Sequence, residues 1–409
     1  MEALTRRHFI GGLAVAGAAV AISAAAGPAQ AAPSKAAPEA ASDIETWQLI
    51  GKDVFTGDAE GTRGQGVATD GSHWYFSSSN GLEITDMKYN TVLTTSPAIP
   101  AELANPSQLS SKGLNHIGDV DYADGHLYIP LDSSMSDPGS PHEYPYEYNT
   151  PVFALYKAGD LTFTGRATAL DAHGVHDIAS WVAVDAEKGL AYGMAYADAT
   201  QIAVYRLSDF TFKKYIPISQ PINEAQGGKV HQGWIYFSCN DAEQTIARAN
   251  LKTGEVQVLF HLTVPYPQEV EGLAFLETGD GLTLNILNRE QPDPNGPSNV
   301  TFYHYLLQTP GKPVLKGTPE VGSYLTANHG KWTPAPKFSY QWLLNGTPVA
   351  HATGHRFDLL STYLGDKVAV EVTGTWADGT STTVESASVK VRRDSGRASG
   401  HKGRTTSRR

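Results

Sequence analysis

The pattern of hydrophobic and polar positions between Ile44 and Gln308 repeats five times along the chain. In each copy, a strand rich in small residues leads into a turn that contains glycine, and a strand with alternating apolar positions follows. The spacing between copies is typical of propeller blades that carry loop insertions. The copies are residues 64–80, 116–132, 176–196, 225–239 and 270–288, and their second strands superpose Tyr75, Tyr128, Tyr192, Tyr236 and Leu284.

Each copy is followed by residues for outer strands, such as 245–250 and 255–262 after the fourth copy. The fifth copy has a third strand at 300–307, but a stretch rich in Pro and Gly follows and leaves no fourth strand. The segment 44–50, ahead of the first copy, is free to take that place. Closing the ring in this way would remove exposed sheet edges. We therefore predict that residues 44–309 form an all-β, five-bladed β-propeller.

After a linker at 310–314, residues 315–391 show short strands with aromatic residues between them. This stretch resembles the Ig-like modules found at the C-termini of actinobacterial exported proteins. The resemblance implies a small Ig-like β-sandwich with Trp342 in its core, which serves as a spacer or an adhesion unit without catalysis. The matching residues are Gly322, Leu325, Trp332, Pro334, Tyr340, Gln341, Trp342, Asn345, Gly346, Gly365, Val368 and Val370.

The composition agrees with this division into more than one domain. The chain has 409 residues, of which 41% are hydrophobic and 18% charged, and this length exceeds that of one ordinary domain. The 40 glycines and 24 prolines indicate many turns and short strands rather than long helical bundles. A single cysteine excludes an internal disulfide framework and any zinc site built from several cysteines.

The N-terminus has the features of an export signal. Arg6 and Arg7 precede an apolar run that ends in a small-x-small cleavage pattern at Ala31. We predict that residues 1–31 are a twin-arginine signal peptide and that the mature protein is secreted. The alternative is an amphipathic or transmembrane N-terminal helix. Residues 32–43 are rich in Ala, Pro and Ser, which predicts a disordered spacer.

The charge of the chain is unevenly distributed. The formal net charge is -11, but the Gly/Ser/Thr-rich tail at 392–409 carries +6 and is expected to be disordered, so residues 32–391 carry -18. An acidic body of this size argues against nucleic acid as a partner. The basic tail could contact anionic cell-wall polymers or the body itself, or it could simply be solvated.

A propeller brings the starts of its innermost strands together at one mouth of the central channel, together with the loops between second and third strands. One such loop, 132–150, places tyrosines beside Glu143 and Glu147, and this combination suits stacking on sugar rings. We therefore expect an extracellular carbohydrate as the partner, bound by a monomer. The expected mouth residues are Gln65, His116, His176, Asp177, Gln226, Glu269 and Glu271, with Asp119 deeper, and the loop contributes His142, Tyr144, Tyr146 and Tyr148.

Two kinds of glycan cleavage fit such a mouth. Hydrolysis needs two carboxyl groups, for which Asp119 and Glu271 are the candidates, supported by Asp177. Elimination from an acidic sugar needs a base, either His116 or His176, and a proton donor such as Tyr146. The acidic body would repel such a sugar unless a cation or Arg289 intervened, so hydrolysis ranks above elimination.

A third chemistry is a metal centre. His116, His176 and Glu271 could together bind a divalent metal, as in a metal-dependent hydrolase or phosphoesterase, although the sequence requires no metal. The remaining alternative is a lectin-like propeller that binds a carbohydrate without chemistry, because fold alone does not imply function.

Other residues in the repeats have a structural interpretation. Asp121, Asp185 and Asp241 lie near turns, where aspartate often accepts hydrogen bonds from nearby backbone. Cys239 lies on an apolar strand, which predicts a buried small residue. Gln65-Gly66 and Glu271-Gly272 are similar to the strand starts of five-bladed glutaminyl cyclases. Three tryptophans are expected to pack between blades: Trp74, Trp181 and Trp234.

Overall fold

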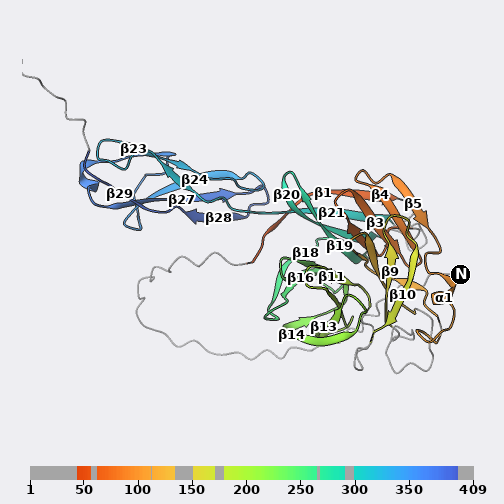
Figure 1. The fold of residues 1–409 in the computed structure, drawn as a ribbon. Helices are drawn as coiled ribbons and strands as arrows, with labels where there is room; N and C mark the ends of the chain where they lie inside the picture. Colours follow the sequence, from red (N-terminus) through yellow and green to blue (C-terminus); the bar gives the residue numbers. More distant parts are fainter. Residues whose placement is uncertain are drawn as a thin grey trace, which may run out of the picture. The chain divides into compact units, whose positions relative to one another are not determined.

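The computed structural model describes residues 44–56, 62–111, 113–133, 151–170, 179–264, 268–290 and 299–394. These residues form almost only antiparallel β-sheets (Figure 1). The helical elements among them are the short helix α1 (Ala101–Ala104) and the 3-10 turn η1 (Ser361–Tyr363). None of the helices in the described part of the chain is long and apolar enough to span a membrane.

Residues 44–309, here called the five-sheet region, contain five sheets, one for each copy of the sequence repeat. In the first, third and fourth sheets, the order of strands in space follows the order in the chain; in the second sheet, the first two strands both pair with the third. The first two sheets contain β2 (Gly66–Thr69), β3 (His73–Ser78), β4 (Gly81–Asp86) and β5 (Thr91–Thr95), then β6 (His116–Ile117), β7 (Asp121–Ala123), β8 (His126–Asp132), β9 (Val152–Lys157) and β10 (Phe163–Ala169). The next two contain β11 (Ala183–Asp185), β12 (Leu190–Met194), β13 (Ala199–Arg206) and β14 (Phe212–Ile222), then β15 (Ala225–His231), β16 (Trp234–Cys239), β17 (Thr245–Asn250) and β18 (Val256–His261).

The fifth sheet combines both ends of the five-sheet region. Its strands are β19 (Gln268–Thr278), β20 (Gly281–Glu290), β21 (Asn299–Leu307) and β1 (Trp47–Thr56). β1 is antiparallel to β21, and the pairing runs from Trp47 opposite Leu307 to Thr56 opposite Asn299. The N-terminal segment therefore takes the fourth position that the repeat pattern left open, and its strand extends further along the chain than the sequence indicated.

The innermost strands form a closed cycle. β2 contacts β7, β7 contacts β11, β11 contacts β15, β15 contacts β19, and β19 returns to β2. An apolar cluster fills the space between each pair of neighbouring sheets; one example is the packing of Trp181 in the third sheet against Phe237 in the fourth. Trp74 of the first sheet likewise packs against Phe302 of the fifth. The predicted packing role of these two tryptophans is confirmed.

Residues 310–394, here called the C-terminal sheet pair, form two sheets around one apolar core. The alternation of buried and exposed residues along strands such as β23 explains why each sheet covers this core with one face. Trp342 is fully buried in the core, as expected. The first sheet contains β22 (Val314–Lys316), β23 (Tyr324–Asn328) and β26 (Arg356–Asp358), and the second contains β24 (Lys337–Leu344), β25 (Thr347–Pro348), β27 (Lys367–Thr375), β28 (Ser381–Glu385) and β29 (Val389–Lys390).

Candidate functional site

Glycines allow the innermost strands to approach one another closely at the centre of the five-sheet region. A Cβ atom on Gly66 would lie 2.4 Å from the Cα of Asp119, and one on Gly272 would lie 2.7 Å from the Cα of Gly66. A Cβ on Gly228 would lie 2.4 Å from the ring of Trp181. These distances are shorter than van der Waals contact, so side chains at these positions would force the strands apart. Protein atoms therefore fill the centre of the five-sheet region at the level of these glycines.

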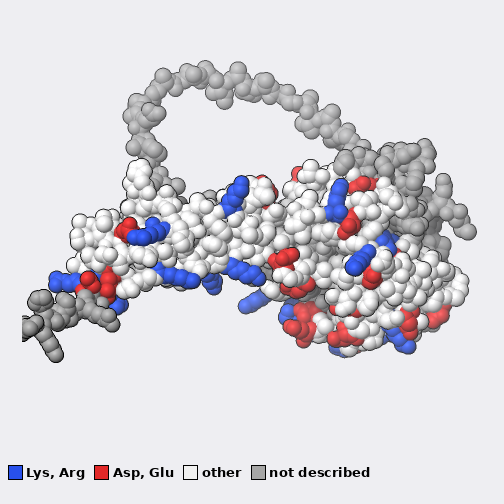
Figure 2. All heavy atoms as spheres, turned by 90° about the horizontal axis from the view of Figure 1, so that it is seen from above, with Lys and Arg blue, Asp and Glu red and all other residues white. Residues whose placement is uncertain are grey.

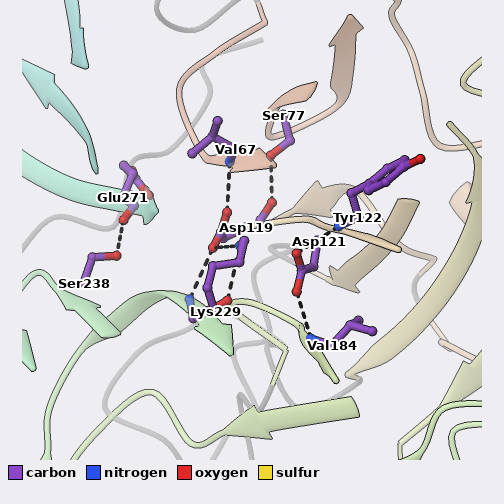
Figure 3. Close-up of polar contacts among 11 residues, drawn as sticks. Val67, Ser77, Asp119, Asp121, Tyr122, Val184, Lys229, Ser238 and Glu271 are labelled. Carbon is purple, nitrogen blue, oxygen red and sulfur yellow. Dashed lines mark hydrogen bonds and ion pairs between the residues drawn. The ribbon is translucent and has the colours of Figure 1, made fainter. Parts of the chain in front are cut away.

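A buried ion pair lies within this centre (Figure 3). The Lys229 ammonium is 2.6 Å from Oδ2 of Asp119, and both side chains are almost completely buried. Asp119 also accepts hydrogen bonds from the backbone N–H groups of Val67 and Gly228, at 2.9 and 3.2 Å. Asp119, between β6 and β7, thereby connects the first and fourth sheets. Partners of this kind suit an anchor of the ring more than a group that exchanges protons with a substrate.

Asp121 lies two residues further along the chain and makes a similar connection. Its carboxylate accepts hydrogen bonds from the backbone N–H groups of Tyr122, at 2.9 Å, and of Val184 in the third sheet, at 2.8 Å. Burial raises the pKa of Asp119 to about 7 and that of Asp121 to about 6, although the nearby Lys229 ammonium acts in the opposite direction. The centre thus contains two carboxyl groups for one cation.

Gln65 and Glu271 lie one residue before the central glycines, toward the end at which the innermost strands begin. That end is called the mouth here. The Gln65 side-chain amide donates to the Glu271 carboxylate at 3.3 Å, and the Gly272 N–H donates to the Gln65 carbonyl at 2.9 Å. The Glu271 side chain is 1% exposed, and its backbone carbonyl accepts a hydrogen bond from the hydroxyl of Ser238 (Figure 3). The structure therefore brings two of the predicted mouth residues together.

His116 begins the innermost part of the second sheet and forms a pair with Asp132 at the mouth end. Nδ1 of His116 lies 3.0 Å from Oδ1 of Asp132, which is 1% exposed, while the His116 side chain is 14% exposed. The two residues face each other in the antiparallel pairing of β6 and β8. A carboxylate beside Nδ1 holds the imidazole ring in one orientation, which suits a histidine that transfers protons through Nε2.

The remaining predicted residues in the described part of the chain have less suitable surroundings. Gln226 is the second residue of the innermost strand of the fourth sheet and is 7% exposed. Arg289 forms an ion pair with Glu269 at 3.1 Å, and the Arg289 side chain is 10% exposed. The guanidinium that was expected to offset the charge of an acidic sugar is therefore already neutralised within the fifth sheet.

Several predicted site residues lie outside the described residues. This applies to both residues predicted in the third repeat and to the tyrosine-bearing part of the loop. Among the described residues, no group of three or more His, Cys, Asp or Glu is arranged to hold a metal ion. The predicted metal centre includes His176, which is not described, so the arrangement of this centre stays a prediction. The residues concerned are His142, Glu143, Tyr144, Tyr146, Glu147, Tyr148, His176 and Asp177.

The structural interpretations of three polar or small residues are confirmed. Asp185 accepts a hydrogen bond from the backbone N–H of Lys188 at 3.1 Å, and Asp241 accepts one from that of Thr245 at 2.9 Å. Both bonds lie within turns, as expected for aspartate near a strand end. Cys239 is a buried free cysteine.

Two important residues, one at the centre and one at the mouth, were not predicted. Lys229 follows two glycines in the innermost strand β15, and a lone lysine in a strand of small residues is a recognisable signal of a buried cation that needs a partner. Asp132 was considered only as the start of a loop. Its position opposite His116 depends on the pairing of β6 with β8, which skips β7 and could not be derived from the repeat.

No protein-family model matches the chain, and no curated protein matches it.

Proposed function

We propose that the five-sheet region is a five-bladed β-propeller and that residues 315–391 are an Ig-like module. The closed cycle of innermost strands supports the propeller, because five sheets that meet in sequence order around one centre form such a ring. The apolar core between two antiparallel sheets supports the Ig-like module. The twin-arginine signal at 1–31 makes secretion part of the proposal.

We further propose that the mouth of the propeller cleaves an extracellular glycan by hydrolysis. The observation that carries this proposal is the close pair of His116 Nδ1 and Asp132 Oδ1, 3.0 Å apart, at the same end of the innermost strands as the carboxyl group of Glu271. In this proposal Glu271 is the acid and His116 is the base, and both lie at the mouth end of the filled centre. Of the two carboxyl groups predicted for hydrolysis, those of Asp119 and Glu271, only that of Glu271 stays a candidate for catalysis, because Asp119 is bound to Lys229.

The proposed reaction is a displacement at the anomeric carbon. The carboxyl group of Glu271 donates a proton to the glycosidic oxygen as the bond to the leaving sugar breaks, and Nε2 of His116 removes a proton from the attacking water. Asp132 stabilises the imidazolium that forms. Release of the products is followed by return of the proton from His116 to Glu271 through solvent.

The test is a panel of plant and microbial glycans, analysed for new reducing ends and for unsaturated products. Glu271→Gln and His116→Asn should each lower turnover by about 100-fold or more without a large change in melting temperature. Matched controls are Glu277→Gln, at the exposed end of β19, and His73→Asn. His73 also pairs with an aspartate, Asp70, at 3.2 Å, but it lies where β2 ends and β3 begins, away from the mouth.

Each outcome of this test is informative. Unsaturated products would replace hydrolysis by elimination, and binding without any product would replace cleavage by a lectin-like function. If the wild-type protein neither binds nor cleaves any glycan of the panel, the carbohydrate proposal is wrong. Equal losses in the control variants would show that stability, rather than the mouth, determines turnover.

A further inference from the structure

The outer face of the three-stranded sheet in the C-terminal sheet pair has a regular arrangement of side chains. Leu315, Leu325, Ala327 and Phe357 point into the core, so the residues that alternate with them point outward. The registers place Lys316 beside Thr326 and Thr326 beside Arg356, in one row across the sheet. The term outer face is used below for the surface made of Val314, Lys316, Tyr324, Thr326, Asn328, Arg356, Asp358 and Leu360.

Three exposed apolar side chains lie on this outer face. Val314 is 54% exposed, Tyr324 is 47% exposed and Leu360 is 52% exposed. Leu360 belongs to the outer face because Leu359 points into the core and continues the pairing with the strand that contains Tyr324. Three of the four large hydrophobic side chains that are exposed in residues 310–394 thus lie on one surface, where the registers space them along the sheet rather than in one contiguous patch.

The aromatic ring on the outer face is held in place by its neighbours. The Arg356 guanidinium lies 3.9 Å from the centroid of the Tyr324 ring, and it also forms an ion pair with Asp358 at 2.7 Å. Stacking on a guanidinium that is itself fixed reduces the freedom that the ring would lose on binding a ligand. Beside this ring, Gly322 carries no side chain, and a Cβ there would meet no atom within 4 Å.

The charge of the outer face complements an anion. Lys316 and Arg356 are cationic, and the only carboxylate on this face, that of Asp358, is bound to Arg356. Among the described residues, Lys316 has no ion-pair partner. Residues 310–394 as a whole carry +2, whereas residues 44–309 carry -18. Figure 2 shows the same contrast, with Lys and Arg spread along the C-terminal sheet pair and acidic side chains frequent on the five-sheet region.

From these observations we propose that the outer face binds an acidic polysaccharide. One sugar ring of the polymer packs its apolar face on Tyr324 and another, further along the polymer, contacts Val314, while a carboxylate between them pairs with Lys316. The surface is a sheet face rather than a groove, and an extended polymer can cross several strands of such a face. This binding is independent of the reaction proposed at the mouth, and it gives the C-terminal sheet pair a role in holding the protein to an acidic matrix.

Affinity electrophoresis of the full chain tests this proposal, with polygalacturonate in the gel as the acidic polysaccharide and dextran as the neutral comparison. Polygalacturonate should retard the wild-type protein and dextran should not. Tyr324→Ala and Lys316→Glu should each weaken the retardation by about five-fold or more. Added salt should reduce the contribution of Lys316 more than that of Tyr324, because only the former depends on charge.

The matched controls lie outside the outer face. Leu364→Ala removes the fourth exposed apolar side chain, and Lys367→Glu reverses an exposed charge on β27 in the other sheet. Both should keep wild-type retardation. Val314→Thr, which hardly changes side-chain shape, provides a second test of the apolar contacts if Tyr324→Ala lowers the melting temperature. Equal retardation of the controls and the outer-face variants, retardation in dextran, or no retardation of the wild type would each overturn the proposal.

Discussion

Lys229 lies at the centre of the five-sheet region and Trp342 at the centre of the C-terminal sheet pair, and both are almost fully buried. Lys229 follows two glycines in β15 and pairs with Asp119. Trp342 instead stacks on Phe357, with ring centroids 5.1 Å apart, and its indole N–H donates to the Gly354 carbonyl at 2.8 Å. The centre of the five-sheet region is thus filled by small and charged residues, and that of the C-terminal sheet pair by large aromatic ones.

This difference follows from how many strands meet at one place. Five innermost strands converge in the five-sheet region, so large side chains there would separate the strands, and the backbone groups and short polar chains that remain must satisfy one another. Two sheets facing each other leave a layer about 10 Å thick, which large apolar residues fill. Apolar packing in the five-sheet region lies between neighbouring sheets instead.

The largest effect should come from removing the central cation. Lys229→Met leaves the buried carboxylate of Asp119 without its ion pair and should lower the free energy of unfolding by about 3–5 kcal/mol. Denaturant unfolding measures this loss. Lys188→Met is the control, because Lys188 also lies 2.6 Å from an aspartate but is 57% exposed, so the loss should be below about 1 kcal/mol. Similar losses of unfolding free energy in Lys229→Met and Lys188→Met would mean that burial does not increase the contribution of the central ion pair to stability.

A smaller effect is expected from a methyl group added at the centre. A Cβ on Gly272 would lie 2.4 Å from Oδ1 of Asp119, so Gly272→Ala should destabilise the protein by about 1–3 kcal/mol through overpacking. Gly279→Ala, at the turn after the same strand, meets no atom within 4 Å and should leave the unfolding midpoint nearly unchanged. A tolerated Gly272→Ala would contradict the close contact of the innermost strands.

The smallest effect should be a dependence of stability on pH. The pKa of Asp119 is raised by burial to about 7, above its unfolded value, so its stabilising contribution is present at low pH and is lost as the pH rises through 7. Between pH 6 and 8 the free energy of unfolding should fall by about 1 kcal/mol. In Asp119→Asn, most of this fall should be absent, and the smaller part that remains comes from Asp121, whose pKa is also raised by burial, to about 6. A stability that rises over the same interval in the wild type would show that Asp119 is ionised throughout.

Much of the arrangement of strands could be predicted from the sequence, because alternation of apolar residues and glycine turns are local signals. The five tyrosine or leucine positions aligned from the repeat all lie on the second strands of their sheets, and the N-terminal segment completes the fifth sheet. The site was harder to predict. Asp119 and Lys229 are distant in sequence, and only the meeting of the second and fourth sheets shows that the candidate acid already has a partner.

The pairing of β1 with β21 has a consequence for how the protein is made. β1 is the first strand of the five-sheet region to leave the ribosome, and β21 is the last, so the fifth sheet cannot be completed before nearly all of the region has been synthesised. Four sheets can assemble on the nascent chain while the first segment still waits for its neighbour. A chain that stops before Asn299 would leave both β1 and β20 with unpaired edges, exposed to other chains.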